Sequence, residues 1–351
     1  MIPSRLFPRL VLTALVLLAG LAGASCSKSA APDATAPAAK AKIVIGLSLD
    51  TLKEERWQHD RDIFKAEAEK LGAEVVILSA NSDDTQQVRD VETLISKGVN
   101  VLVIVPHNGS AMDRAVKDAN DAKIPVISYD RLILNANIDY YLSFDNVKVG
   151  EAQGTYVKDH LPADHVAQVV RIYGAPTDNN AKLFKQGQDN ILNPLIAAGK
   201  IKVVHEDWAT DWKPDVAKNI MNAAITKAGH AIDIVVASND GTAGGAIQAL
   251  SEEKIDGKVL VTGQDAELAA CQRIMNGTQA MTIYKPLKTL ATQAAQIAVA
   301  IGQGHPPAIA DTLDNGMKKV PSIFVPVVAV DKGNMLATVV ADGFHTAADL
   351  K

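Results

Sequence analysis

Residues 42–105 read KIVIGLSLDTLKEERWQHDRDIFKAEAEKLGAEVVILSANSDDTQQVRDVETLISKGVNVLVIV, and this stretch decides the fold. Three apolar runs, KIVIGLSL, AEVVIL and NVLVIV, are separated by two longer amphipathic segments, 56–71 and 84–97. Because the apolar runs are continuous and rich in β-branched residues, they predict strands that are buried on both faces. Such strands are typical of a parallel sheet covered by helices.

The same alternation continues along the chain and restarts once. A helix over 110–122 and a strand over 125–129 complete the first series, and the second begins with a strand over 166–173. The further helices are expected at 180–198, 214–228, 242–252, 266–275 and 286–302, and the further strands at 201–205, 232–238, 258–262 and 279–284. We therefore expect an α/β protein with two doubly wound parallel-sheet lobes.

The end of the chain indicates how the two lobes are joined. After the helix over 286–302, the run SIFVPVVAV at 322–330 predicts a return to the first lobe and one more crossing. We expect a multi-strand hinge between two lobes, the first formed by 42–144 and 286–321 and the second by 145–285 and 322–351.

The N-terminal residues have the pattern of an export signal. Two arginines precede the apolar run Leu10–Leu18, and the small residues AGLAGASCS follow it. Cleavage after Ala24 would release a soluble protein, whereas Cys26 fits a lipobox and would carry a lipid. Since 27–41 is a flexible Ala/Pro/Ser tether, which is useful behind an anchor, we favour a signal over 1–26 and lipidation of Cys26. Both readings place the protein outside the inner membrane, with membrane contact only through the anchor.

The composition of the 351 residues limits the classes of function. The chain is 48% hydrophobic and 21% charged, with a formal net charge of −5, so nucleic acid is not an expected partner. Of its two cysteines only Cys271 lies in the part expected to fold, and that part therefore has no internal disulfide.

Polar and aromatic side chains follow the predicted strands, where ligands bind in open α/β sheets. They include Asp50, His107, Asn108, Asp130, Arg131, Asp178, Asn179, Asn180, Trp208, Trp212, Asn239, Asp240, Gln264, Asp265 and Lys285. Aspartate, asparagine and arginine can hydrogen-bond neighbouring hydroxyls, and a tryptophan face can cover the C–H face of a pyranose. The set has no nucleophile–base pair and no metal-ligating pattern, so it predicts a binding site for a neutral sugar.

Each of these residues also has a structural interpretation. Any aspartate or asparagine among them can be the N-cap of the following helix. Asp130 and Arg131 can form a local ion pair, Lys285 can be a solvated helix start, and Trp208 can serve in packing. For His107 we expect a solvated or capping residue. The convergence of the set on strand ends in both lobes favours binding.

Trp57 stands in the charged run EERWQHDRD. A helix over 56–71 places Trp57 on the same face as apolar residues of 64–71, which would make it the first core residue. Asp60 and Arg61 share that face, however, and charges are rarely buried without partners. We therefore favour a first helical turn that projects into a cleft, with Trp57 against a ligand.

Several long strings closely resemble the D-xylose-binding proteins of bacterial sugar ABC transporters, in the type I periplasmic binding protein superfamily. They include ERWQHDRDIF, GVNVLVIVPHNG, ISYDR, YLSFDNVKVGE, DNNAKLFKQGQ, VVASNDGTAGGAIQAL, GQDAEL, GTQAMTIYKP and DGFH. The resemblance extends over nearly all of the chain after the tether.

This resemblance implies the type I periplasmic binding protein fold, with a sugar clamped between the lobes. The implied sugar-binding residues are Arg56, Trp57, Asp130, Arg131, Asp178, Asn180, Trp212, Asn239, Asp265 and Lys285. Trp57 and Trp212 would stack on the sugar from opposite lobes. The implied protein is a periplasmic monomer without catalytic residues or cofactor, which delivers D-xylose by hinge closure to a permease driven by a cytoplasmic ATPase. Two departures are the lipid anchor and His107, which stands where a tyrosine is expected.

Three alternatives remain to be compared. A nucleotide-dependent enzyme lacks support, because the glycines of 241–245 do not have the spacing of a nucleotide-binding loop. A sugar-responsive transcription regulator would carry a DNA-binding segment where this chain has an export signal. A receptor for ribose, arabinose, glucose or galactose, with or without a role in chemotaxis, is the third and differs in ligand alone.

Overall fold

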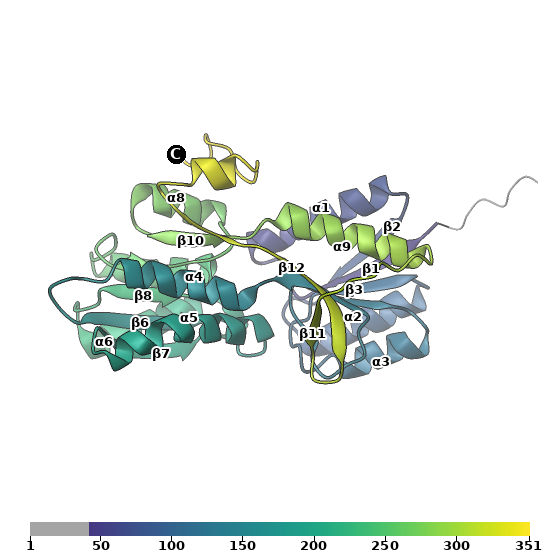
Figure 1. Cartoon of the computed structure of the whole chain (residues 1–351), viewed down its shortest axis with the longest axis horizontal. Coiled ribbons are helices and arrows are strands. Elements are labelled where there is room, and N and C mark those ends of the chain that lie inside the picture. Colours follow the sequence, from purple (N-terminus) through teal and green to yellow (C-terminus); the bar gives the residue numbers. More distant parts are fainter. Residues whose placement is uncertain (1–41) are drawn as a thin grey trace, which may run out of the picture. The chain divides into compact units, whose positions relative to one another are not determined.

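The computed structural model describes residues 42–351, which contain two parallel sheets with helices on both faces (Figure 1). The predicted export signal over 1–26, the predicted tether over 27–41 and the predicted lipidation site Cys26 lie outside the described residues. Within 42–351 no helix combines the length and the apolar character that crossing a membrane requires.

The first sheet has seven strands in the order β11-β12-β5-β4-β3-β1-β2, all parallel except β11. Its strands are β1 (Val44–Leu49), β2 (Glu74–Ser79), β3 (Val101–Ile104), β4 (Val126–Tyr129), β5 (Tyr140–Phe144), β11 (Thr312–Asp314) and β12 (Lys319–Val325). Helices α1 (Glu55–Lys70) and α9 (Leu287–Gly302) pack on one face, and α2 (Asp84–Ser96) and α3 (Asp113–Asp121) on the other (Figure 1).

Small and branched side chains explain this packing. All four residues of β3 are fully buried, as expected for a central strand that is covered on both faces. The face of α9 toward the sheet and α1 is rich in alanine, with Ala291, Ala294 and Ala298 fully buried. Short side chains allow the two helices to approach each other closely over the sheet.

The second sheet has four parallel strands in the order β7-β6-β8-β9. Its strands are β6 (Ala167–Tyr173), β7 (Ile201–Trp208), β8 (Ile234–Ala237) and β9 (Leu260–Val261). Helices α4 (Asn146–Asp159) and α5 (Asn179–Ala197) cover one face, and α6 (Pro214–Ala228) and α7 (Asp240–Glu252) the other. The antiparallel pair β10 (Met281–Tyr284) and β13 (Val328–Asp331), α8 (Leu268–Asn276) and the short π-helix Leu336–Val340 complete this lobe.

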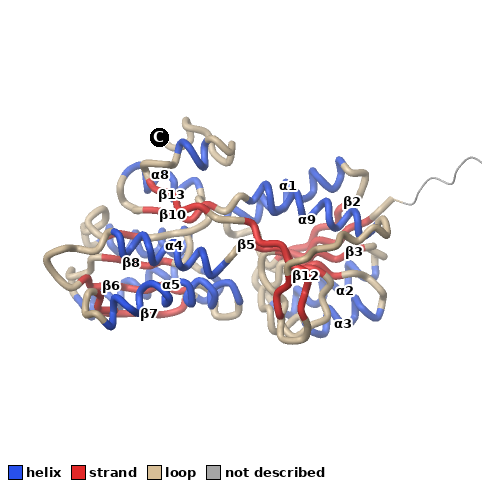
Figure 2. Tube along the Cα trace, in the orientation of Figure 1, coloured by secondary structure: helices blue, strands red, loops and turns tan. Residues whose placement is uncertain are grey.

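Within residues 42–351 the chain passes between the lobes three times. The crossings are Asp145, between β5 and α4, Lys285–Pro286, between β10 and α9, and Pro326–Val327, between β12 and β13. Figure 2 shows β5 and β12, which pair in parallel, running together toward this region. Because β12 stays paired with β5 through Val325, the sheet of the first lobe continues past the expected boundary at residue 321.

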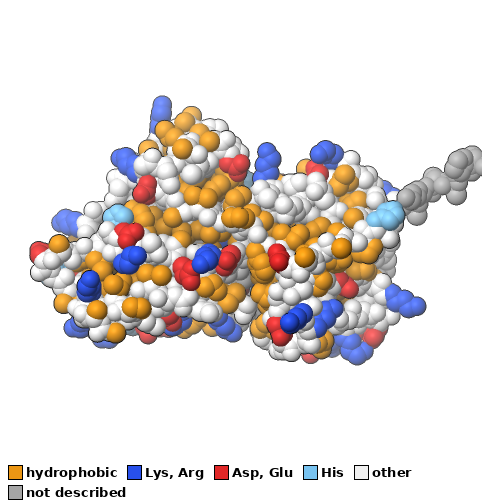
Figure 3. Space-filling model, in the orientation of Figure 1, with side chains coloured by type: hydrophobic (Ala, Val, Ile, Leu, Met, Phe, Trp, Pro, Cys, Tyr) orange, Lys and Arg blue, Asp and Glu red, His pale blue; other side chains and the backbone are white. Residues whose placement is uncertain are grey.

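The predicted fold class, two doubly wound parallel-sheet lobes joined by a multi-strand hinge, is confirmed. Each predicted helix and strand of residues 42–302 is present, with ends that differ by three residues or fewer. Strand β5, helix α4 and the short strand β11 were not predicted from the sequence. Acidic and basic side chains are interspersed on the face shown in Figure 3, without a large area of one charge.

Helix α4 escaped prediction because its buried face is not an apolar stripe. That face includes Gly150, Gln153 and Gly154. A Cβ at Gly150 would lie 2.0 Å from the carbonyl oxygen of Phe184 in α5, and a Cβ at Gly187 of α5 would lie 2.0 Å from the carbonyl oxygen of Val147. Glycine is required at this contact because the two backbones touch, and an apolar pattern does not reveal such packing.

Candidate functional site

A small cavity of about 20 Å³ lies at the carboxyl ends of the strands and is lined by both lobes. All ten residues that the resemblance implied line this one cavity: Arg56, Trp57, Asp130, Arg131, Asp178, Asn180, Trp212, Asn239, Asp265 and Lys285. Glu54, Phe184 and Gln264 line it as well and were not in that set. Gln264 is one of the polar residues that the sequence places after a predicted strand, whereas Phe184 lies within α5 and gives no such signal.

Arg56 organises the part of the site nearest the hinge. Its Nη2 donates to Asp130 Oδ2 at 2.7 Å and to Asp60 Oδ2 at 3.1 Å, and its Nη1 lies 3.5 Å from Asp265 Oδ1 in the second lobe. Burial works against the charge of Arg56, but these carboxylates outweigh it and hold its pKa well above the usual range. Arg56 is therefore a fixed cation with donors directed toward both lobes.

Asp60 supports Arg56 from below the cavity. It is buried, accepts from Arg56 and receives a hydrogen bond from the Tyr129 hydroxyl. Burial raises the pKa of Asp60 to about 6, although Arg56 opposes the shift. The expectation that Arg61 shares this face is wrong, because its guanidinium pairs with Asp62 at the surface.

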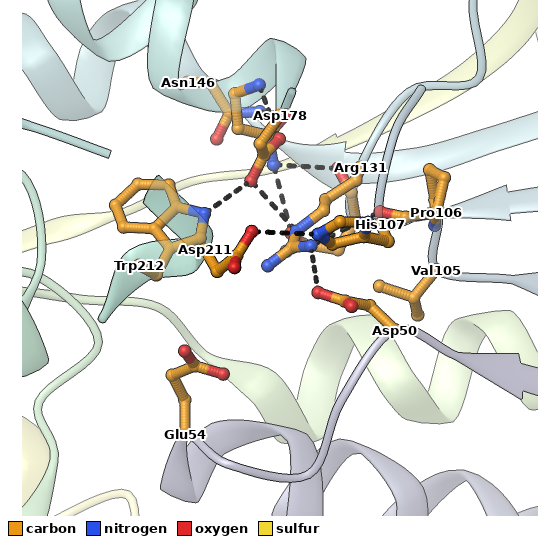
Figure 4. A network of polar contacts seen from close by, with 12 residues as sticks. Asp50, Glu54, Val105, Pro106, His107, Arg131, Asn146, Asp178, Asp211 and Trp212 are labelled. Atoms are coloured by element: carbon orange, nitrogen blue, oxygen red, sulfur yellow. Dashed lines mark hydrogen bonds and ion pairs between the residues drawn. The ribbon is translucent and has the colours of Figure 1, made fainter. Parts of the chain in front are cut away.

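Arg131 joins the two lobes on the other side of the cavity (Figure 4). Its Nη1 donates to Asp50 Oδ2 at 2.6 Å, and its Nε lies 2.9 Å from Asp178 Oδ2 in the second lobe. Asp178 Oδ2 also accepts from Trp212 Nε1 at 3.2 Å, and its other oxygen caps α5 by accepting from the backbone N–H of Asn180 at 2.9 Å. Asp178 thus caps helix α5 and also forms the interlobe ion pair with Arg131.

Trp57 is both a core residue and a wall of the cavity. Only 3% of its surface is exposed, and it packs in the core between α1, α9 and the first sheet. The guanidinium carbons of Arg56 and Arg131 lie 4.1 and 5.1 Å from its ring centroid, distances typical of cation–π contacts. The two interpretations weighed for Trp57, core and cavity, are therefore not alternatives.

Trp212 reaches the cavity from an unusual backbone position in the second lobe. Its φ is +56°, in the left-handed region, and its ring lies against the backbone of Gly174. A Cβ at residue 174 would lie 1.9 Å from the ring, so glycine is required there. Phe184 meets the Trp212 ring edge-on, with centroids 6.3 Å apart. Strain and packing together fix this indole at the cavity wall.

The remaining second-lobe residues combine structural and lining roles. Asn180 Nδ2 donates to Asp130 Oδ1 at 3.0 Å, which adds a further contact across the lobes. Asn239 is the N-cap of α7 and accepts from the backbone N–H of Thr242 at 2.9 Å, as its structural interpretation expected. Lys285 is not a solvated helix start but is fully buried, with Nζ 3.8 Å from Asp265 Oδ1.

Lys285, at the hinge, has a shifted pKa. Burial lowers the pKa of Lys285, and the nearby carboxylates of Asp130 and Asp265 offset part of that shift. Its Nζ also lies 5.2 Å from the ring centroid of Phe144 and 5.1 Å from that of Phe184. A buried ammonium flanked by two rings and two carboxylates is a directed donor for a polar ligand.

His107 is not a solvated or simple capping residue. Its Nδ1 lies 2.6 Å from Asp84 Oδ1, and its Nε2 lies 3.2 Å from Asp211 Oδ1 in the second lobe (Figure 4). Burial lowers its pKa, but the carboxylates of Asp50, Asp84 and Asp211 outweigh burial and raise it above the ordinary value. His107 therefore forms an interlobe contact outside the cavity. Trp208, as expected, packs on Tyr173.

The chemistry of the lining suits a neutral molecule with many hydroxyl groups. Four carboxylates supply acceptors, two guanidinium groups and one ammonium supply donors, and aromatic rings enclose the space. Among the described residues no group of three histidine, cysteine or acidic side chains is arranged to hold a metal ion. Fixed donors and acceptors around an aromatic-walled cavity provide oriented binding.

Comparisons with known proteins point the same way. The model of a periplasmic binding protein domain matches residues 45–306. The chain is 50% identical to the D-xylose-binding periplasmic protein of Haemophilus influenzae, over 87% of this chain and 91% of that one. It is 49% identical to the D-xylose-binding periplasmic protein of Escherichia coli, over 89% and 94% of the two chains.

A solved structure extends the likeness to three dimensions. A carbohydrate transporter solute-binding protein from Chloroflexus aurantiacus, in complex with D-glucose, is similar with a TM-score of 0.82 and 35% identity. The similarity covers 88% of this chain and 98% of that one.

Proposed function

Because this chain belongs to the family of periplasmic binding protein domains, we propose that it is a receptor that captures D-xylose outside the inner membrane and delivers it to an ABC transporter. The observation that carries the proposal is the convergence of ten side chains from both lobes on one cavity. The identity of about half of all residues with two D-xylose-binding proteins supports the choice of sugar.

In the proposed binding mode the sugar lies between Trp57 and Trp212, which cover its apolar faces. Arg56, Arg131 and Lys285 donate to its oxygens, and the aspartates and asparagines accept from its hydroxyl groups. The chain acts as a binding protein rather than as an enzyme, since the proposed roles involve hydrogen bonding and stacking alone.

Capture proceeds by closure of the hinge. Closure around a ligand is the recognised motion of periplasmic binding proteins. The cavity residues of the first lobe form ion pairs and hydrogen bonds with those of the second, as in the pairs Arg131–Asp178 and Asp130–Asn180. A sugar that contacts both lobes favours the closed arrangement, because only differential contact shifts such an equilibrium. The closed monomer then docks on a permease driven by a cytoplasmic ATPase.

The location of the protein is periplasmic, and we propose that a lipid on Cys26 anchors it to a membrane. The support for the anchor is the cysteine after a run of small residues, followed by the tether over 27–41. Incorporation of radiolabelled lipid that is lost in Cys26→Ala would support the anchor. A protein that is unlabelled, with its N-terminus at Ser25 after cleavage at Ala24, would refute it.

Titration calorimetry against a panel of sugars tests the ligand. D-xylose should bind more tightly than ribose, arabinose, glucose and galactose. Tighter binding of any of these four would refute D-xylose as the ligand while retaining a sugar receptor. Failure of the unmodified protein to bind any of the five would refute the proposed function itself.

A further inference from the structure

One acid in the cavity lining differs from the other three in its partners. Asp130, Asp178 and Asp265 each lie near a lining arginine, at 2.7, 2.9 and 3.5 Å. Both carboxylate oxygens of Glu54 are buried and have no hydrogen-bond partner among the described residues. The cations of the lining are thus already engaged by other acids, whereas the carboxylate of Glu54 faces the cavity and accepts no hydrogen bond from the described residues.

Neither helix capping nor pairing with Lys53 explains why the carboxylate of Glu54 is buried. Glu54 occupies the N-cap position of α1 with extended backbone angles, φ −75° and ψ 138°, but its side chain makes no capping hydrogen bond. Lys53 Nζ approaches Glu54 Oε1 at 3.0 Å without hydrogen-bond geometry, and that ammonium donates to the carbonyl oxygen of Asp211 instead. Lys53 is also 35% exposed at its side chain, compared with 7% for Glu54.

The position of Glu54 directs it toward a ligand. It belongs to the turn between β1 and α1, and Figure 4 shows its carboxylate extending into the space below Trp212 and Asp211. Buried polar groups in folded proteins are nearly always satisfied, and an ionised carboxylate accepts hydrogen bonds but donates none. The partner that completes this site must therefore bring hydrogen-bond donors.

We propose that Glu54 is a further ligand-binding residue that sets sugar specificity by accepting hydrogen bonds from two hydroxyl groups of the bound sugar. This inference rests on the proposed sugar-receptor function. Glu54 also gives the lining four carboxylates against three cations, Arg56, Arg131 and Lys285. The ligand class is therefore a neutral sugar with free hydroxyl groups at this end, and sugar acids and sugar phosphates are disfavoured by charge.

Two variants at this position test the proposal, with a matched control on the same helix. Glu54→Gln keeps the size and one acceptor but removes the charge, and Glu54→Leu removes both acceptors. Glu69→Gln is the control, since Glu69 lies at the exposed end of α1 and pairs with Lys65. Titration calorimetry is carried out on all three variants and the unmodified protein with D-xylose and the four competing sugars.

Glu54→Leu should weaken binding of the sugar that the unmodified protein binds most tightly by about tenfold or more, the worth of a hydrogen bond to a charged group. Glu54→Gln should weaken it less, and Glu69→Gln should change it less than twofold. The melting temperature of Glu54→Leu without sugar should be unchanged or higher, because a buried carboxylate without hydrogen-bond partners is removed. That combination distinguishes a ligand-binding group from a structural one.

Deoxy derivatives of D-xylose identify the hydroxyl groups. A derivative that lacks a hydroxyl facing Glu54 should bind the unmodified protein more weakly than D-xylose does. The substitution Glu54→Leu should then reduce the affinity for this derivative by a smaller factor than it reduces the affinity for D-xylose. Binding of every sugar within twofold of the unmodified protein in both Glu54 variants would overturn the inference and leave the receptor function standing. If the unmodified protein binds none of the sugars, the proposed function fails, and the inference that rests on it fails with it.

Discussion

The ion pair between Arg131 and Asp178 offers the sharpest test of how the lobes cooperate, through the substitution Asp178→Asn. The pair spans the two lobes, with Arg131 Nε 2.9 Å from Asp178 Oδ2 and side chains that are 5% and 3% exposed. Asparagine has the same shape as aspartate and is an equally good N-cap, so the start of α5 should be retained. The change therefore keeps the cap of α5 and removes the charge that Asp178 presents to Arg131, to the Trp212 indole and to the proposed sugar.

The magnitude follows from the burial of the pair. Breaking a buried ion pair by removing one partner costs about 3–5 kcal/mol. Two features reduce that cost here, since the asparagine oxygen can still accept a hydrogen bond and Arg131 keeps Asp50 at 2.6 Å. We expect a loss of about 2 kcal/mol, which corresponds to roughly 30-fold weaker sugar binding. The loss falls on the closed arrangement, because the pair exists only when the lobes meet.

The assay combines titration calorimetry with D-xylose and thermal melting without sugar. Asp178→Asn should raise the dissociation constant roughly 30-fold and leave the melting temperature nearly unchanged. The control is Asp83→Asn at the N-cap of α2, where the side chain accepts from the backbone N–H of Gln86 at 2.7 Å outside the cavity. Affinity within twofold of the unmodified protein in Asp178→Asn, or an equal loss in Asp83→Asn, would refute the reasoning.

Three other perturbations follow from the same geometry. Trp57→Ala should lower both sugar affinity, measured by calorimetry, and the free energy of unfolding, the latter by about 3–5 kcal/mol in denaturant titrations; loss of only one of the two would contradict its double role. Burial lowers the pKa of His107, but carboxylates, Asp50 foremost, raise it by more than burial lowers it. The contact with Asp211 is therefore complete below the ordinary value of 6.5 and is lost as the pH rises through the raised pKa. Affinity should accordingly fall as the pH rises above 6.5, and the fall should be smaller in His107→Gln; equal pH profiles for the two proteins would disprove this. Gly174→Ala should displace the second-lobe indole and weaken binding at least tenfold, whereas unchanged indole fluorescence and affinity would show that the loop adapts.

Regular apolar patterns made most of the fold predictable from the sequence. The strands of both lobes are continuous runs of β-branched residues, and these define a parallel sheet without further information. Helix α4 was missed since its contact with α5 depends on Gly150 and Gly187, whose packing places backbone against backbone. The pairing of β12 with β5 joins residues that are more than 170 positions apart, so the end of the first-lobe sheet could not be read locally.

The candidate site was predictable where position and side-chain type agreed. Asp130 follows β4 directly, and Asn239 and Asp265 lie in the segments just after β8 and β9, so all three lie around the cavity. His107 was misjudged because its second partner, Asp211, is 104 positions away in the other lobe. Contacts that depend on how two lobes meet leave no local pattern in a sequence.

Phe184 and Glu54 show a second limit. Phe184 lies within α5 rather than at a strand end, and only the approach of the helix to Trp212 brings it to the cavity. Glu54 lies in the charged run EERWQHDRD, and nothing in that run indicates that this side chain is only 7% exposed and lines the cavity. The side-chain types at the strand ends predicted a sugar as the ligand, whereas the packing of the helices determines which charged side chains line the cavity.

A crystal structure of the protein grown with D-xylose tests the central claim most directly. We predict one sugar in the cavity, with Trp57 and Trp212 on its two faces and Arg56, Arg131 and Lys285 within hydrogen-bond distance of its oxygens. A sugar bound elsewhere, or a cavity filled by side chains in crystals saturated with D-xylose, would contradict the account.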